Sequence, residues 1–166
     1  MALESKALTN LAETLCWHSP SRAQVLADRA LEFNRTVGNQ LELIKVYAVK
    51  AVAEHGPGAL MRAETSVNAS LELVGTTGYR AGAIFALSAH VFQLLVANQP
   101  EAAAELAASI HDIAAELDVY FFWAEVAGWW LQTAGIRAGG RHSAAEWLEG
   151  SEEARARWCL VLRDRL

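Results

Sequence analysis

Small and apolar residues recur along this chain at spacings of three, four and seven, the period of one face of an α-helix. The pattern is most complete after Pro100, and the stretch after Pro20 repeats it. The positions after Pro100 are Ala103, Leu106, Ala107, Ile110, Ile113 and Ala114, and those after Pro20 are Ala23, Leu26, Ala27, Ala30, Leu31 and Phe33. Because no strand-like alternation bounded by turn residues occurs, the pattern predicts an all-α fold.

Three prolines mark predicted helix starts. Pro20, Pro57 and Pro100 each follow a short polar or glycine-containing break and precede a helix-favouring stretch. Proline is tolerated at the first helical position because its missing N–H would be unpaired there anyway. The small positions stand 3, 7 and 10 residues after Pro20 and Pro100, whereas Glu64 stands 7 residues after Pro57. The second stretch therefore fits this register poorly.

A fourth helix start follows from the proline spacing. The prolines lie 37 and 43 residues apart, which places the next start near residues 137–143. Ser143-Ala144-Ala145-Glu146 has the spacing of a capping box. Gly139-Gly140 just before it would end the preceding helix.

A partner helix precedes each of these starts. The four partners are expected at Ser5–Trp17, Asn39–Glu54, Tyr79–Ala97 and Val119–Ala134. We therefore expect about eight helices in four antiparallel hairpins, within a single domain that spans residues 1–166. The expected units are 5–38, 39–78, 79–118 and 119–150, followed by a terminal helix at 151–166. A repeat of ~34–43 residues is typical of helical solenoids.

These units resemble tetratricopeptide repeats. The helix Trp123–Thr133 fits that pattern best, since Gly128 and Gly135 match the family's two small positions, seven residues apart. Ala103 with Ile110, and Ala23 with Ala30, stand where the family has small residues in the second helix. The resemblance implies a right-handed solenoid that binds a partner along the groove lined by the first helix of each pair.

Residues 40–150 are also similar to the divergent C-terminal repeats of large bacterial ATPase-type regulators, including cyclase-linked ones. The residues that carry this similarity are Glu101-Ala102-Ala103-Ala104-Glu105 and Trp123 with Gly128-Trp129. The similarity implies a bacterial scaffold, regulatory or sensor role rather than chemistry.

Composition and charge narrow the partner classes. Apolar residues make up 53% of the chain and the formal net charge is −5. Non-specific nucleic-acid binding needs clustered Lys and Arg, so a nucleic acid is not expected as a direct partner. The arginines near the C-terminus are diluted by Glu152, Glu153 and Asp164, which favours a solvated helix face. They are Arg155, Arg157, Arg163 and Arg165.

Several features predict a cytoplasmic location. Cys16 and Cys159 are far apart and form no disulfide framework, which suits a reducing compartment. The segment from Met1 to Glu13 has no apolar core of the signal-peptide type. The apolar stretch Ala81–Ala97 contains Ser88, His90 and Gln93, so it predicts a buried helix rather than a membrane span.

The register of Gly128 and Gly135 predicts the residues that face the groove. In the fourth unit these are Phe122, Glu125, Trp129 and Gln132, and the equivalent offsets in the third unit give Phe85, Ser88, Phe92 and Leu95. Aromatic and neutral polar groups suit a peptide or a small organic ligand. The aromatic run from Tyr120 to Trp130 has two interpretations, core packing between hairpins or a partly open pocket.

Motifs that carry chemistry are absent from the sequence. The five histidines show no HxxxH, HxxE or HExxH spacing, and there is no GxSxG, GxxxxGK[ST] or GxGxxG sequence. We therefore expect no catalytic residue, metal site or cofactor. His90 inside an apolar stretch is expected to be a hydrogen-bonded core residue.

The sequence therefore predicts a non-enzymatic binding or scaffold module that holds a protein segment or a small molecule in its groove. One alternative is self-association into a homodimer through the apolar residues of 151–166, which are Trp158, Leu160, Val161, Leu162 and Leu166. A third interpretation, an enzyme that uses Glu125 with His90 between helices, lacks a supporting spacing.

Overall fold

The computed structural model describes residues 2–16, 19–55, 57–97, 99–118 and 122–133. Within these residues the chain forms seven α-helices and no strand, which confirms the all-α prediction. The helices are α1 (Ala2–Leu15), α2 (Pro20–Val37), α3 (Gln40–Ala53), α4 (Ala59–Thr77), α5 (Arg80–Val96), α6 (Pro100–Glu116) and α7 (Phe122–Thr133). The predicted helix after Ser143 and the terminal helix 151–166 lie outside the described residues.

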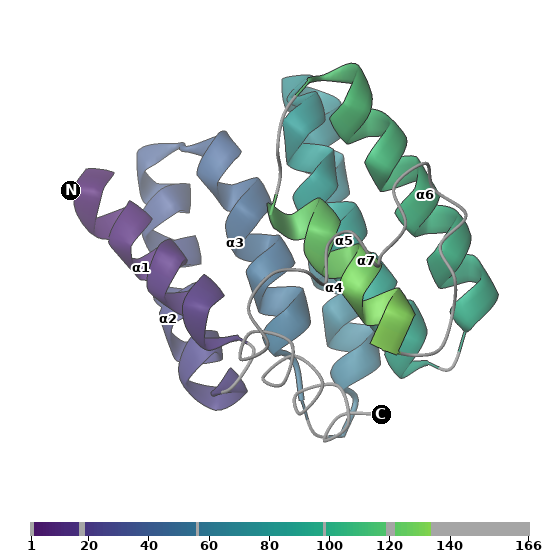
Figure 1. Cartoon of the computed structure of the whole chain (residues 1–166). Helices are drawn as coiled ribbons and strands as arrows, with labels where there is room; N and C mark the ends of the chain where they lie inside the picture. The colour runs from purple at the N-terminus through teal and green to yellow at the C-terminus, as the bar shows by residue number, and fades with distance from the viewer. Residues whose placement is uncertain (1, 17–18, 56, 98, 119–121, 134–166) are drawn as a thin grey trace.

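Each helix packs against the next along the chain, and the odd-numbered helices also pack against one another. Thus α1 contacts α3, α3 contacts α5, and α5 contacts α7. Figure 1 shows the array running from α1 and α2 at one end to α6 at the other. The helices α3 and α5 lie in the middle and have neighbours on several sides.

The central positions of α3 and α5 follow from their composition. A helix that is apolar on more than one face needs more than one neighbour to cover it. In α3 the buried residues occur all round the helix, and they are Leu43, Ile44, Val46, Ala48, Val49, Ala51, Val52 and Ala53. The apolar stretch Ala81–Ala97 forms most of α5, in agreement with the buried-helix prediction. None of the helices in the described ranges has the length and apolar character needed to cross a membrane.

The small residues of α2 and α6 are the contact positions that their spacing predicted. Ala23, Ala27 and Ala30 of α2 are fully buried, as are Ala103 and Ala107 of α6. A methyl side chain lets neighbouring helix backbones approach closely without leaving a void. The two helices therefore use equivalent positions after their prolines to pack against their partners.

Pro20 and Pro100 are the first residues of α2 and α6, as predicted, but the prediction that Pro57 begins a helix is wrong. The helix α4 begins at Ala59 and its N-cap is Gly58, whose φ is +72°. A left-handed residue directly after the proline redirects the chain before the helix can start. The buried residues of α4 stand 6, 9, 10 and 13 residues after Pro57, so only one of them falls on an offset that α2 and α6 share. They are Ala63, Ser66, Val67 and Ser70.

The turn between α2 and α3 has local chemistry that ends one helix and begins the next. Gly38 adopts the left-handed conformation, with φ +70°, and donates its N–H to the Arg35 carbonyl. The Asn39 side chain then accepts a hydrogen bond from the Glu42 N–H at 3.3 Å, which caps α3.

Buried hydroxyl groups join helices that are far apart in sequence. Ser5 of α1 donates to Asn34 Oδ1 of α2 at 2.7 Å, and Ser70 of α4 donates to the Ile44 carbonyl of α3 at 2.8 Å. Ser88 of α5 donates to the Trp123 carbonyl of α7 at 3.0 Å. These side chains are fully or almost fully buried, so each bond satisfies a polar group that would otherwise destabilise the core.

Candidate functional site

The groove residues predicted on α5 lie at different depths. Phe85 is half-buried, and its ring makes an edge contact with Trp123 of α7, with 5.6 Å between the ring centroids. Ser88 and Leu95 are buried between helices, and Phe92 is 3% exposed. Of these residues, Phe92 lines a pocket at the C-terminal end of α5.

The groove residues predicted on α7 are only partly described. The backbone places Phe122, Glu125, Trp129 and Gln132 on this helix. Glu125 is half-buried, and the side chains of the other three lie outside the described part of the structure. The same holds for Tyr120 and Phe121, so the two interpretations of the aromatic run remain predictions.

A chain of polar and aromatic contacts crosses the odd-numbered helices. Glu13 of α1 forms an ion pair with Lys45 of α3 at 2.6 Å, and its other carboxylate oxygen accepts a hydrogen bond from Trp123 Nε1 at 2.6 Å. Lys45 also donates to Asn10 at 3.1 Å and lies over the Phe85 ring. The sequence pattern did not indicate Glu13 or Lys45. Two lysines, Lys45 and Lys50, interrupt the apolar helix α3, and nothing in the pattern distinguishes the one that pairs with Glu13.

An open pocket of about 620 Å³ lies where the C-terminal ends of α3 and α5 meet the N-terminal end of α4. Its wall is mostly apolar and includes the predicted residue Phe92. The lining residues are Ala51, Glu54, His55, Gly58, Ala59, Leu60, Met61, Ala63, Phe92, Gln93 and Val96. A volume of ~300–1,000 Å³ with few polar groups is typical of sites for small molecules.

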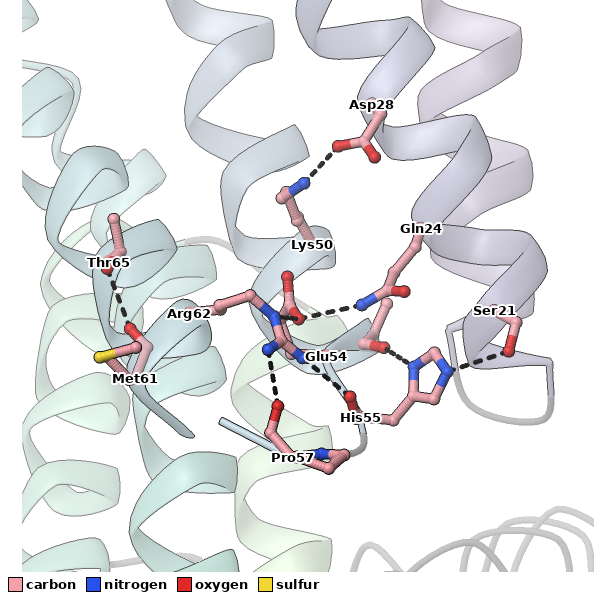
Figure 2. Close-up of polar contacts among 11 residues, drawn as sticks. Ser21, Gln24, Asp28, Lys50, Glu54, His55, Pro57, Met61, Arg62 and Thr65 are labelled. Atoms are coloured by element: carbon pink, nitrogen blue, oxygen red, sulfur yellow. Dashed lines mark hydrogen bonds and ion pairs between the residues drawn. The ribbon is translucent and has the colours of Figure 1, made fainter. Parts of the chain in front are cut away.

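The segment that joins α3 to α4 forms part of this wall, and Arg62 holds it in place (Figure 2). Arg62 Nε donates to Glu54 Oε2 at 2.6 Å, while its two terminal nitrogens donate to the carbonyls of Pro57 and His55 at 2.8 and 2.9 Å. Gln24 of α2 donates to the same Glu54 oxygen at 3.0 Å. Because the Glu54 side chain is only 4% exposed, these bonds satisfy a buried charge.

The His55 ring is also held from both sides (Figure 2). Its Nδ1 lies 3.1 Å from the Ala53 carbonyl, and its Nε2 lies 3.0 Å from the Ser21 hydroxyl. A carbonyl oxygen can only accept, so Nδ1 carries the proton in the neutral ring and Nε2 accepts from Ser21. The ring therefore joins the α3–α4 segment to α2 through bonds that leave neither nitrogen free.

Gln93 differs from the other polar groups of the pocket. It lines the pocket, its residue is 7% exposed, and its Nε2 is buried without a hydrogen-bond partner among the described residues. Most buried polar atoms in native structures have a partner, so an unsatisfied amide beside a pocket indicates a group that a ligand can satisfy. Helical periodicity did not indicate Gln93, because a polar residue in a predicted buried helix carries no sign of a ligand.

His90 lies on α5, half-buried, in the apolar part of the array. Burial lowers the pKa of the His90 ring because it disfavours the charged form, and the nearby Glu64 carboxylate partly opposes this effect. His90 is not fully buried, and its ring makes no hydrogen bond to a described residue, so the prediction of a hydrogen-bonded core histidine is not met. The pairing of His90 with Glu125 remains untested. Within the described ranges, no group of three His, Cys, Asp or Glu residues is arranged to hold a metal ion.

Comparison with known proteins gives no assignment. No protein-family model matches the chain, and no curated protein and no solved structure matches it.

Proposed function

We propose that this chain is a non-enzymatic binding module that holds a small molecule in the pocket between the ends of α3, α4 and α5. We propose further that its helices form a tetratricopeptide-like, right-handed solenoid, which the contacts among α1, α3, α5 and α7 support. The observation that carries the functional proposal is the pocket itself. It has the size and the mainly apolar wall of a ligand site.

A protein segment bound along the odd-numbered helices has less support. Glu13 and Lys45, which lie along that row, already bind each other, and Ser88 is fully buried. A peptide would have to break the ion pair before it could use either charge. The pocket, in contrast, has open volume between the described helices as they stand.

The α3–α4 segment also supports a preformed site. Arg62 binds two backbone carbonyls and one carboxylate, so this part of the wall is fixed before a ligand arrives. A site that is ordered in advance binds more tightly, because less conformational entropy is lost on binding. Leu60 and Met61, which are 44% and 69% exposed, place further apolar surface beside the opening.

Substitution of Val96 by Phe tests the proposal. Val96 is half-buried in the pocket wall, so the larger ring should fill the pocket rather than enter the core. The neutral dye Nile red serves as the probe, and its fluorescence rises when it enters an apolar site. We expect V96F to weaken dye binding about tenfold or more, which corresponds to roughly 1.4 kcal/mol.

Val25→Phe is the matched control. Val25 is 61% exposed on α2 and does not line the pocket, so the same change there should leave dye binding unaltered. Circular dichroism and the thermal midpoint should show native helix content in both variants. Equal dye affinity in V96F and the unaltered protein would contradict the proposed pocket function.

A further inference from the structure

The side chains of the pocket wall favour a ligand with an apolar surface. Phe92, Val96, Leu60 and Met61 present aromatic, branched and thioether surface, and alanines fill the spaces between them. Methionine adapts its shape to a ligand because its side chain is unbranched and polarizable. A molecule that fits this wall therefore has a mainly hydrocarbon surface.

The charges of the pocket select for a neutral molecule. Among the described residues that line it, Glu54 is the only acidic one, and its carboxylate already binds Arg62 and Gln24. A cationic ligand would compete with Arg62 for this carboxylate. No lysine or arginine belongs to the described lining, and Arg62 is already paired with Glu54, so an anionic ligand would find no cation of the lining to pair with.

Gln93 is the residue of the pocket that can recognise a polar group of the ligand. Its Nε2 has no hydrogen-bond partner in the part of the chain that the structure describes, while the His55 ring nitrogens both have one. The last torsion of a glutamine side chain is broad and roughly two-fold, so a turn of the amide exchanges its nitrogen and oxygen. The NH₂ group can thereby face the pocket and donate to a ligand oxygen.

We propose that the pocket binds a neutral, mainly apolar molecule with a carbonyl-type oxygen, which accepts a hydrogen bond from the Gln93 side-chain amide. This assignment rests on the proposed function, because it names the ligand class of the same pocket. It makes Gln93 the residue that distinguishes an oxygenated ligand from a hydrocarbon of the same shape.

Two probes of nearly equal shape test this assignment on the full chain. Acetophenone carries the carbonyl oxygen, and ethylbenzene lacks it. Dissociation constants for both are measured by titration of ¹⁵N-labelled protein, with the backbone amides of α5 and the Gln93 side-chain amide as reporters. The same titrations are repeated with Gln93→Met, which keeps the length of the side chain and removes its donor.

The comparison of the two proteins removes the intrinsic difference in solubility between the probes. We expect the preference for acetophenone over ethylbenzene to be about five- to tenfold larger in the unaltered protein than in Q93M, as one hydrogen bond implies. The Gln93 side-chain amide should shift with acetophenone and not with ethylbenzene. Benzoate and benzylammonium, which carry opposite charges on a similar ring, should bind more weakly than acetophenone.

The remaining outcomes separate the two proposals. Binding of neither neutral probe would overturn both the ligand class and the pocket function. If the unaltered protein and Q93M prefer acetophenone over ethylbenzene to the same degree, the role of Gln93 is overturned, but the pocket function is not. Tighter binding of benzoate or benzylammonium than of acetophenone would overturn the assignment of a neutral ligand.

Discussion

Gly82 shows how a single missing methyl group sets the distance between α5 and α3. A Cβ added at Gly82 would lie 2.7 Å from Tyr79 Cδ1 and 3.1 Å from Ile44 Cγ2. The Tyr79 ring can turn aside, but Ile44 is fully buried and has no free space to occupy. Glycine is therefore retained here at a cost in helix propensity, because the packing of α5 on α3 requires it.

Substitution of Gly82 by Ala should destabilise the protein. Alanine favours a helix over glycine by ~1 kcal/mol, but forcing atoms into a packed core costs ~1–3 kcal/mol. We expect a net loss of about 1 kcal/mol or more in the free energy of unfolding, measured by urea titration. Gly75→Ala in α4 is the control, since no atom lies within 4 Å of the added Cβ. A stabilising effect of both substitutions would contradict the close approach at Gly82.

At the scale of helices and their connections, the α3–α4 segment depends on Arg62. Its guanidinium holds the Glu54 carboxylate and the carbonyls of His55 and Pro57, so it fixes the path of the chain before α4. Arginine suits this role because its planar group presents several donors in a fixed arrangement. A lysine has the charge but not this geometry.

Removal of the Arg62 side chain should loosen this segment. We expect Arg62→Met to lower the free energy of unfolding by about 1–2 kcal/mol, a value reduced because the Arg62 side chain is 45% exposed. The free energy of unfolding of Arg62→Lys should lie between those of R62M and the unaltered protein. Nile red should bind R62M more weakly, because the pocket wall loses order. Arg29→Met, at an exposed position of α2, should change neither property. If R62M matches R29M in both measurements, Arg62 does not hold the segment.

The same segment shows why the sequence predicted some helix starts and not others. At Pro20, Pro100 and Asn39 the start depends on local chemistry, either a proline at the first position or a capping side chain. At Pro57 the start depends on Gly58 and on the bonds that Arg62 makes with the preceding carbonyls. The bonds of Arg62 span five to eight residues and depend on the path that the chain takes between α3 and α4, which the usual helix-start patterns do not describe.

The candidate site, like the helix starts, was predictable only where it depends on a pattern within one helix. Helical periodicity selected Phe92 on α5, and Phe92 does line the pocket. Glu54 and Gln93 were not selected, because the pocket forms where the ends of three helices meet, and periodicity within one helix does not describe that meeting point. That Gln93 Nε2 lacks a hydrogen-bond partner among the described residues is likewise a result of how the helices pack.

At the scale of the whole molecule, Glu13 links the first and the last described helix. Its carboxylate binds Lys45 of α3 and Trp123 of α7, and 110 residues separate Glu13 from Trp123. Repeat arrays are usually stabilised by contacts between neighbouring units alone. A direct bond between α1 and α7 adds an interaction between distant units and should make unfolding more cooperative.

A double-mutant cycle measures this link. Trp123→Phe should lower the free energy of unfolding by about 2–3 kcal/mol through lost volume and a lost hydrogen bond. Combined with Glu13→Met, it should show a coupling energy of about 1 kcal/mol. A second cycle with Glu4→Gln, at an exposed position of α1, should be additive. Additivity in the first cycle would contradict a direct contribution from this bond.

The bond between Glu13 and Trp123 also has a consequence for how the chain is made. Protein synthesis proceeds at ~5–20 residues per second, so α1 leaves the ribosome roughly 5–20 s before its partner on α7 exists. Once Lys45 has been synthesised, it is the partner of the Glu13 carboxylate in the nascent chain, and the edge that will receive Trp123 remains uncovered. The array is therefore complete only after its last described helix has been translated. A nascent chain halted before residue 123 should be captured by chaperones more readily than one halted after α7 has been released from the ribosome.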